Sequence, residues 1–290
     1  MRELDYLEPA TVAEASRIAA DLGDGARFIA GGTALLLALR QRLLSPTHLV
    51  SLARLAPLRG IAVDAQGALH IGALSLHADI AASLTVQRHA PMLAAMAAQV
   101  ANPQVRNQGT LGGNLCYADP STDPPGCLLA LDARVQLASH RGLRELPLAD
   151  FLVDYFTTAL EPDELVQAII VPPLPDASRG RYDRFLRTAA EHRPMVSVAA
   201  VVQVERGLCR GARIVVGAAV PVPLRLAEAE ACLVGQAPSR ERIDAAARAA
   251  AEAITPLDDL RGNADYRRAM VEVQLRRSLA ALFDLAQESA

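Results

Sequence analysis

Two glycine pairs, far apart in the chain, constrain its fold more than any other feature of the sequence. The first stands in Ala30-Gly31-Gly32-Thr33-Ala34, where it ends a short apolar strand predicted over residues 27–30. Glycine lacks a Cβ and adopts left-handed dihedral angles, and Thr33 is placed to cap the helix expected next. Exposed N–H groups at such a turn, with the dipole of the helix, predict an anion site that fits a pyrophosphate. An ordinary strand-to-helix turn is the alternative, since glycine is the default turn residue.

The second pair lies in the segment Gln108-Gly109-Thr110-Leu111-Gly112-Gly113-Asn114. Its three glycines are interleaved with hydroxyl and amide side chains, which leaves many main-chain donors unpaired by regular structure. Two anion cradles in one chain indicate a single elongated ligand. The string nearest to a Rossmann fingerprint, Gly23-Asp24-Gly25, lacks the third glycine and follows a predicted helix, so a doubly wound NAD-binding domain is disfavoured.

The first fifty residues have the pattern of a small α/β unit. Thr11 and Glu14 form a capping box at the start of a helix that Gly23 ends. The elements expected after it are a strand over 27–30, the first glycine turn, a helix over 34–44 and a strand over 49–52.

From residue 60 onward the pattern changes. The expected elements are a hairpin of strands 61–63 and 69–71, helices over 76–83 and 91–100, and strand-like apolar runs over 128–138 and 165–171. Between residues 102 and 126 the chain is rich in Gly, Pro, Asn and Asp and has little periodicity. A connection of that length in a compact domain usually serves a function, so a site is expected there.

A stiff and then polar linker divides the chain at residues 172–180, where four residues of sequence PPLP precede a polar stretch. The second part is expected to be an α+β arrangement of a hairpin and helices. Its predicted elements are strands 195–204 and 212–219, a turn at 205–207, and helices 224–233, 240–254 and 266–285.

The composition excludes several classes of function. A chain of 290 residues exceeds the size at which one hydrophobic core keeps growing, so two domains are expected. The net charge of −3 provides no electrostatic attraction to nucleic acid. All 29 basic residues are arginine, and the absence of lysine excludes P-loop, Schiff-base and Ser-x-x-Lys chemistry.

The cysteines and the amino terminus argue against a metal or iron–sulfur site, secretion and a membrane span. The four cysteines form no C-x-x-C pair, so they are expected to be apolar side chains rather than zinc or iron–sulfur ligands. The amino terminus lacks a signal-peptide pattern, and no apolar run reaches the roughly 18 to 20 residues that cross a bilayer. A cytoplasmic protein without a membrane span is expected.

The two glycine turns belong to longer motifs that are highly specific in combination. These are Ala-Gly-Gly-Thr-Ala at 30–34, the run from Asn102 to Asn114, Ala-Asp-Pro-Ser-Thr-Asp-Pro-Pro at 118–125, Glu164 to Pro172, and Ala264-Asp-Tyr-Arg267. Over nearly its whole length the chain resembles the FAD-binding medium subunits of molybdenum hydroxylases, the family of the carbon monoxide dehydrogenase medium subunit and the xanthine dehydrogenase flavin domain. The resemblance implies an α+β fold. A PCMH-type, vanillyl-alcohol oxidase-like FAD-binding domain would cover 1–175, with two α/β subdomains of about 1–56 and 57–175, and a C-terminal α+β domain of antiparallel sheet and helices would cover 176–290.

By this resemblance, FAD is held at both turns. The residues implied to bind its diphosphate and flavin are Ala30, Gly31, Gly32, Thr33, Ala34, Thr110, Leu111, Gly112, Gly113 and Asn114. Asp123 matches an aspartate on the adenosine ribose, and an Asp-Pro turn residue is its alternative.

The resemblance assigns the remaining contacts less sharply. Cys116 and Leu165 match apolar contacts to the flavin or adenine and are equally compatible with plain core. In the segment from 185 to 194, the contact with the isoalloxazine falls to either Arg187 or His192, and a surface loop is an equally good interpretation of His192.

The resemblance also implies the division of labour in a complex. A large subunit would carry the molybdenum cofactor, a small subunit two [2Fe-2S] clusters, and this chain would pass electrons from those clusters to an external acceptor, in a dimer of heterotrimers. The lack of iron–sulfur cysteines agrees with clusters on a partner. Two alternatives stay open. One is a non-catalytic scaffold that keeps the fold without the flavin. The other is a free-standing flavin oxidase, for which the sequence shows neither an evident residue for covalent flavin attachment nor an evident substrate base.

Overall fold

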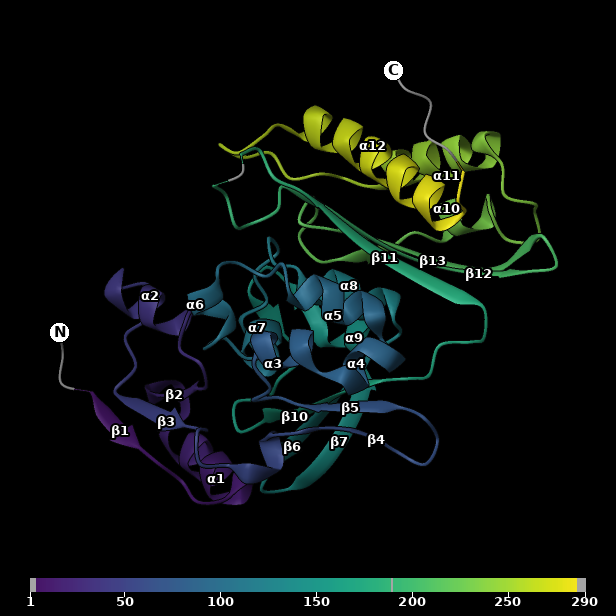
Figure 1. Cartoon of the computed structure of the whole chain (residues 1–290). Coiled ribbons are helices and arrows are strands. Elements are labelled where there is room, and N and C mark those ends of the chain that lie inside the picture. The colour runs from purple at the N-terminus through teal and green to yellow at the C-terminus, as the bar shows by residue number, and fades with distance from the viewer. Residues whose placement is uncertain (1–3, 189, 286–290) are drawn as a thin grey trace.

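The computed structural model describes residues 4–188 and 190–285. Residues 1–3 and 286–290 of the predicted domains, and Ala189 of the segment expected to contact the isoalloxazine, lie outside the described residues. The elements stack in layers, seen from bottom to top in Figure 1 as a five-stranded sheet, a layer of helices, a four-stranded sheet and a second layer of helices. A small three-stranded unit stands at one side of this stack.

The small unit is a parallel sheet with the strand order β1-β3-β2. It comprises β1 (Asp5–Leu7), α1 (Val12–Leu22), β2 (Ala26–Ile29), α2 (Leu35–Arg40) and β3 (His48–Ser51), with 3-10 turns at Gly23–Gly25 and Ala56–Leu58. The cap by Thr11 is confirmed, because Thr11 Oγ1 accepts from the Glu14 N–H at 3.1 Å, whereas the Glu14 carboxylate accepts from the N–H of Ala10, one residue before the cap, at 2.8 Å. The second helix is shorter than predicted, since the chain reverses at Arg42 with a φ of 60°.

The next unit contains a five-stranded antiparallel sheet of order β4-β5-β10-β6-β7. Its strands are β4 (Ile61–Val63), β5 (Leu69–Gly72), β6 (Arg134–Ser139), β7 (Gly142–Pro147) and β10 (Leu165–Val171), and a two-stranded hairpin of β8 (Leu152–Asp154) and β9 (Thr157–Thr158) precedes the last of them. The last strand in sequence, β10, thus lies between β5 and β6, which come much earlier in the chain. The sheet is complete only when residues 165–171 are in place.

Helices cover one face of this sheet. They are α3 (His77–Ala82), α4 (Leu84–His89), α5 (Pro91–Ala97), α6 (Pro103–Arg106), α7 (Leu111–Tyr117), α8 (Pro124–Ala130) and α9 (Leu148–Phe151). The segment 102–126 is therefore not irregular throughout, because Asn102 and Thr110 cap α6 and α7 with their side-chain oxygens.

The prediction of a strand over 128–138 is wrong in its first half. The two prolines at 124 and 125 begin α8, where proline is well tolerated, and β6 starts only at Arg134. Every residue of α8 is buried, so its sequence shows none of the polar positions that reveal a helix by their period.

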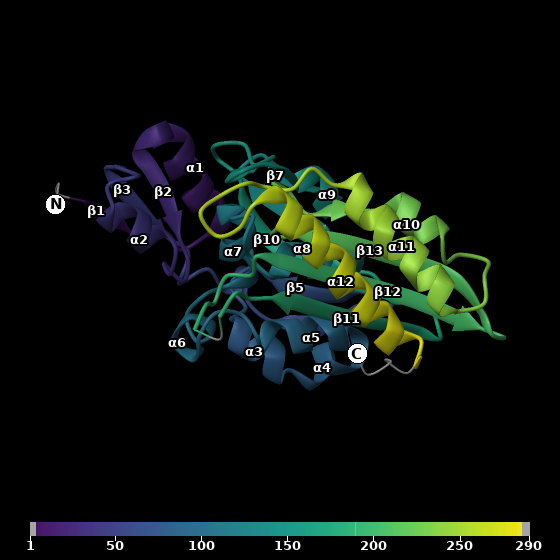
Figure 2. The same cartoon turned by 90° about the horizontal axis from the view of Figure 1, so that it is seen from above.

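The third unit is a four-stranded antiparallel sheet with helices on its outer face. It consists of β11 (Ser178–Phe185), β12 (Val196–Glu205), β13 (Leu208–Gly217), β14 (Leu224–Arg225), α10 (Ala227–Ala231), α11 (Arg240–Ala253) and α12 (Ala264–Leu282). Figure 2 shows α12 lying across β11 and β12. Two predictions need correction here. The polar half of the expected linker runs into β11, which begins at Ser178, and the helix predicted from 224 begins at Ala227, after a short strand.

β12 is buried on both faces, which explains its continuous apolar sequence. Val198, Ala200 and Val202 pack in the core beneath α10–α12, whereas Ala199 and Val201 join the core that α5 and α8 share with the five-stranded sheet. The α+β fold class is confirmed. The boundary between residues 175 and 176 stays a prediction, and one hydrophobic core spans it.

Candidate functional site

The two glycine turns, far apart in sequence, lie against each other. A Cβ built on Gly31 would stand 2.0 Å from the main-chain oxygen of Gln108 and 3.1 Å from the Cα of Gly109. A real Cβ never comes so close to main-chain atoms, so only glycine lets the first turn dock on the second. The two predicted cradles are therefore parts of one site.

The other glycines are required for different local reasons. Gly32 has a φ of +71°, in the left-handed region. A Cβ on Gly112 would stand 2.5 Å from the Ala73 side chain, and one on Gly113 would stand 2.7 Å from Thr110 Oγ1. Gly113 is exposed, whereas Gly112 is buried against the strand end at Ala73.

The main-chain donors of the two turns differ. Within the described residues, the successive N–H groups of Gly31, Gly32, Thr33 and Ala34 have no hydrogen-bond acceptor. In the second turn, by contrast, the N–H groups of Leu111 and Gly112 donate to the carbonyls of Ser75 and Ala73, and those of Gly113 and Asn114 are bound to Thr110. The prediction of unpaired main-chain donors is therefore wrong for residues 111–114 of the second turn, because that turn pairs with residues 73–77 and with Thr110. The described chain leaves the donors of the first turn unpaired. Of the two turns, only the first has, among the described residues, the row of free main-chain donors that an anion site requires.

The predicted capping role of Thr33 is wrong. Helix α2 begins after Ala34, which makes no side-chain cap, and Thr33 is exposed. Its Oγ1 lies 3.5 Å from the position of a Cβ on Gly109, at the contact between the two turns. The turn takes one residue more than the sequence pattern suggests, and this leaves the hydroxyl of Thr33 at the site.

Asn114, on α7, carries a polar atom that the protein does not satisfy. Its Nδ2 donates to Thr122 Oγ1 at 2.8 Å, while its buried Oδ1 has no partner among the described residues. A buried acceptor without a donor costs roughly 1 to 3 kcal/mol. Such an atom fits a bound group that brings a donor of its own.

Cys116 and Leu165 lie on neighbouring elements but differ in exposure. Cys116 is an exposed residue on α7, but its thiol lies against the main chain of Val166, and burial raises the pKa of the thiol to about 12. The thiol is therefore neutral at pH 7. Leu165 is a core residue with 2% of its surface exposed, as its interpretation as plain core predicts.

Asp123 stands just before α8 and is 2% exposed. Tyr182 Oη donates to its Oδ1 at 2.7 Å, and Arg184 Nη1 lies 3.3 Å from its Oδ2. Burial raises the pKa of this carboxyl to about 6, although Arg184 and Tyr182 both favour the charged form. The carboxylate thus joins α8 to β11, in addition to any contact with a ribose.

The segment between β11 and β12 does not present Arg187 as a free cation. Its guanidinium and main-chain N–H are bonded to Glu191, and the pairing raises the pKa of Arg187 further. His192 is exposed. The segment contacts the end of the site through the ion pair of Arg193 with Asp119.

Three residues at the site were missed by sequence reasoning: His77, Tyr182 and Arg184. The His77 N–H donates to the Gly109 carbonyl at 3.2 Å, and its buried Nδ1 has no partner in the described part of the chain. Burial and the nearby Arg106 lower the pKa of this histidine to about 4, so the ring is neutral at pH 7. A single histidine at the first position of a short helix gives no sequence signal, and Tyr182 and Arg184 come from a strand that carries no motif.

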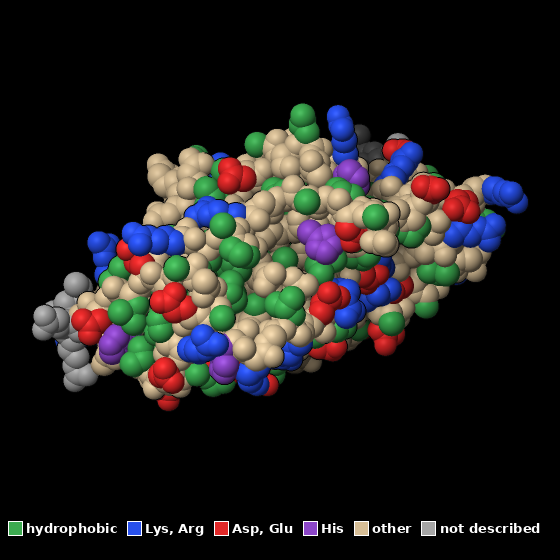
Figure 3. Space-filling view, turned by 90° about the horizontal axis from the view of Figure 1, so that it is seen from below, with side chains coloured by type: hydrophobic (Ala, Val, Ile, Leu, Met, Phe, Trp, Pro, Cys, Tyr) green, Lys and Arg blue, Asp and Glu red, His purple; other side chains and the backbone are tan. Residues whose placement is uncertain are grey.

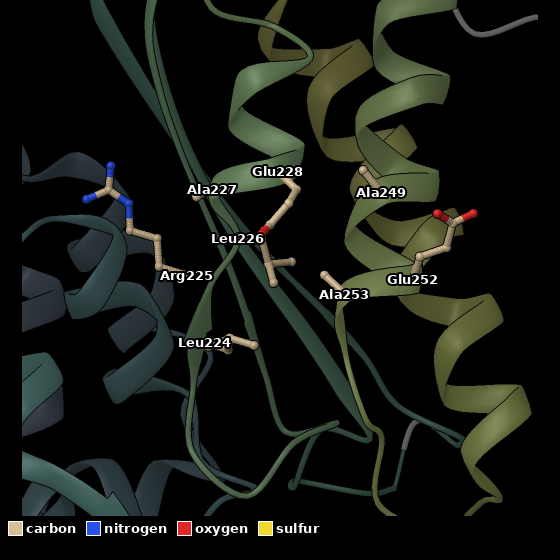
Figure 4. A pocket seen from close by; sticks show the side chains of 8 residues that line it. All are labelled: Leu224, Arg225, Leu226, Ala227, Glu228, Ala249, Glu252 and Ala253. Carbon is tan, nitrogen blue, oxygen red and sulfur yellow. The ribbon is translucent and has the colours of Figure 1, made fainter.

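A cavity of about 540 Å³ lies elsewhere, between β14, α10 and α11. Figure 4 shows Arg225 pointing away from Ala249 and Ala253 on α11. Arg225 is bonded to Glu230 and Asp132, and none of the predicted site residues lines the cavity. The cavity therefore has no part in the site.

One face of the molecule carries charges of both signs. Figure 3 shows acidic and basic side chains interspersed on the face seen from below, without a basic patch. Among residues 4–188 and 190–285, no cluster of His, Cys, Asp and Glu is arranged to hold a metal ion. In the same residues, no helix combines the length and apolar character needed to span a membrane.

Comparison with known proteins covers nearly the whole chain. Residues 2–174 match the family described as FAD binding domain in molybdopterin dehydrogenase, and residues 182–282 match the CO dehydrogenase flavoprotein C-terminal domain. The 6-hydroxypseudooxynicotine dehydrogenase complex subunit alpha of Paenarthrobacter nicotinovorans is 37% identical over 276 residues, which are 95% of this chain and 93% of that protein. The carbon monoxide dehydrogenase medium chain of Hydrogenophaga pseudoflava is 33% identical, over 96% of each chain.

Solved structures agree over the same length. A carbon monoxide dehydrogenase structure from Hydrogenophaga pseudoflava, which lacks the Mo-pyranopterin moiety of the molybdenum cofactor, contains a chain that superposes with a TM-score of 0.94 at 34% identity, over 98% of this chain and 99% of that one. Quinoline 2-oxidoreductase from Pseudomonas putida 86 gives a TM-score of 0.92 at 31% identity, over 97% of each chain.

Proposed function

Since the chain belongs to the family of FAD-binding flavoproteins of molybdopterin dehydrogenases, we propose that it is the FAD-binding medium subunit of a molybdenum-containing hydroxylase. In this role it takes electrons from a [2Fe-2S] subunit and passes them to an external acceptor. The single observation that carries the proposal is the row of main-chain N–H groups at 31–34, which have no acceptor in the described protein and lie against the second glycine turn.

The proposed FAD site follows the geometry of the two turns. Gly31, Gly32, Thr33 and Ala34 bind the diphosphate, with Ala30 at the strand end, because their N–H donors point to no protein acceptor. The remaining assigned residues are Thr110, Leu111, Gly112 and Gly113, which support the cradle, and Asn114, Cys116, Asp123, Leu165 and Arg187, which contact the rest of the cofactor.

The chemistry belongs to the cofactor and the placement to the protein. When bound, FAD supplies one- and two-electron transfer, which suits a link between iron–sulfur clusters and a two-electron acceptor. The residues of this chain bind and orient the cofactor. The thiol of Cys116 and the ring of His77 are both neutral at pH 7. None of the assigned residues needs to act as an acid, base or nucleophile.

The partners in this proposal are a molybdenum-binding large subunit and a [2Fe-2S] small subunit, in a cytoplasmic dimer of heterotrimers. The names of the relatives support a complex, since they include a complex subunit alpha and medium chains. The substrate is chosen by the large subunit, because this chain carries no substrate base among its assigned residues.

Binding of FAD to the purified chain tests the proposal. We expect a flavin absorbance spectrum after gel filtration and a higher melting temperature with FAD than without it. A ligand at a hundredfold excess over its Kd stabilises a protein by about 2.7 kcal/mol, which a thermal scan resolves readily.

FMN is the matched control, since it has the same ring system and one phosphate but lacks the adenosine monophosphate part, and it should stabilise the chain much less. A chain that retains no flavin and whose melting temperature is unchanged by FAD contradicts the proposal and favours the scaffold alternative. A chain that turns over substrate with oxygen on its own favours a free-standing oxidase.

A further inference from the structure

The side-chain amide of Asn114 has a hydrogen bond at its nitrogen and, among the described residues, none at its oxygen, so the orientation of the amide decides which atom a ligand can reach. Its amide is anchored only through Nδ2, which donates to Thr122 Oγ1 at 2.8 Å. Its Oδ1 is buried without a partner in the described chain. The hydroxyl of Thr122 therefore holds the Asn114 side chain in place while the Oδ1 stays available to another donor.

Thr122 is itself held by its neighbours on both sides. Arg261 Nη1 lies 3.2 Å from Ser121 Oγ, and Tyr182 Oη donates to Asp123 at 2.7 Å. Arg193 pairs with Asp119 at the start of the same segment. All three of these donors come from the C-terminal part of the chain, whereas Asn114 belongs to the helix that follows the second glycine turn.

We propose that Thr122 is a positioning residue for FAD, which holds the Asn114 amide with its free oxygen available to an N–H or O–H donor of the cofactor. The C-terminal part fixes Thr122 from both sides and so takes part in cofactor binding without contacting the cofactor at this point. This inference rests on the proposed function, because the donor that satisfies Asn114 Oδ1 is on the FAD.

The test compares FAD affinity in Thr122→Val, Asn114→Ala and the double variant. Valine keeps the shape of threonine and removes the hydroxyl. Because one hydrogen bond contributes about 1 kcal/mol, we expect Thr122→Val to weaken FAD binding about fivefold. Since Thr122 acts through Asn114, the double variant should bind FAD no more weakly than Asn114→Ala alone.

Two further variants separate positioning from general structural damage. Thr122→Ser retains the hydroxyl and should restore an affinity close to that of the wild type. Thr47→Val removes another threonine hydroxyl, one that bonds to Gly25 and His48 in the small unit, and should leave FAD affinity unchanged. The midpoint potential of the bound flavin should shift in Thr122→Val and return in Thr122→Ser.

The outcomes are distinguishable. Equal affinities of wild type and Thr122→Val, or additive losses in the double variant, overturn the positioning role while the proposed function stands. A wild-type chain that does not bind FAD overturns both. Should Thr122→Val fail to fold, Thr122→Ala takes its place: a loss that Asn114→Ala abolishes supports the proposal, and a loss that persists in the double variant overturns it.

Discussion

Arg267 shows how the chain uses a single buried charge. The residue has no exposed surface, and its guanidinium donates to the carbonyls of Met195 and Ala218 at 2.6 and 3.1 Å and to Asp259 at 2.8 Å. It therefore fastens α12 to the start of β12, the end of β13 and the loop before α12. A planar group with several donors suits this task, which the compact ammonium of a lysine does not.

Replacement of Arg267 by methionine should destabilise the protein strongly. The substitution keeps an apolar stem but leaves two buried carbonyls and Asp259 without their donor, and we expect a loss of about 3 to 5 kcal/mol in the free energy of unfolding. Urea denaturation followed by circular dichroism measures it.

The neighbouring Arg268 provides the control. It is partly exposed and bonds to one carbonyl and to the exposed Asp265, so Arg268→Met should cost less than about 1 kcal/mol. Equal losses in the two variants would show that the buried network contributes nothing specific.

At the scale of elements, the site depends on two turns that fit only without side chains between them. Gly31→Ala places a Cβ 2.0 Å from the Gln108 oxygen, so the turns must separate. We expect this variant to lose at least tenfold in FAD affinity and about 1 to 3 kcal/mol in stability, as overpacked sites do. Fluorescence titration with FAD and urea denaturation measure the two effects.

Gly126→Ala is the matched substitution at a tolerant position. Its Cβ would meet only Ser197 Oγ, at 3.9 Å, and alanine in place of a helical glycine stabilises by roughly 0.5 to 1 kcal/mol. Gly126→Ala should keep FAD affinity. If Gly31→Ala behaved in the same way, the contact between the turns would have no role in binding.

The elements also show what local sequence can and cannot predict. The cap of α1 by Thr11, the hairpin of β4 and β5 and the strands β10 and β12 follow from short-range patterns, and all are confirmed. Helix α8 was missed because it is buried on all sides, and the cap by Thr33 was wrong because the turn is one residue longer than its pattern. The glycine pairs predicted two ligand-binding segments, whereas the contact of these segments with each other depends on main-chain geometry that no local pattern encodes.

At the scale of the whole molecule, an asymmetric set of ion pairs joins the two parts of the chain. The acidic partners, Asp119, Asp123 and Asp132, lie within the segment from α7 to β6, and the arginines come from β11 onward: Arg184, Arg193, Arg213 and Arg225. The apolar core that spans both parts packs beneath these pairs. Removal of one of these ion pairs should therefore lower the stability of both parts of the chain together.

The stability of the folded protein should depend on pH through Asp123. Its pKa in the folded protein is about 6, above the ordinary value of 3.8, because the carboxyl is buried. A raised carboxyl pKa favours the folded state below pH 4, and this contribution is lost as the pH rises from about 4 to about 6. At about 1.4 kcal/mol per unit, the loss amounts to at most about 3 kcal/mol.

The comparison of wild type with Asp123→Asn isolates this effect from other titrating groups. The stability of the wild type relative to the variant should fall between pH 4 and pH 7, as urea denaturation at several pH values measures. A difference that stays constant over this range, or rises, would mean that Asp123 titrates near its ordinary pKa.

The contact between Gly31 and Gln108 also sets a time for cofactor acquisition. During synthesis the first turn emerges early, the second much later, and β10, which completes the five-stranded sheet, later still. Long-range pairings of this kind form slowly, because the chain must close large loops before the contacts stabilise it. A nascent chain that ends before β10 carries both turns but lacks the strand that completes the sheet, so under the proposed function FAD enters a polypeptide that already includes residues 165–171.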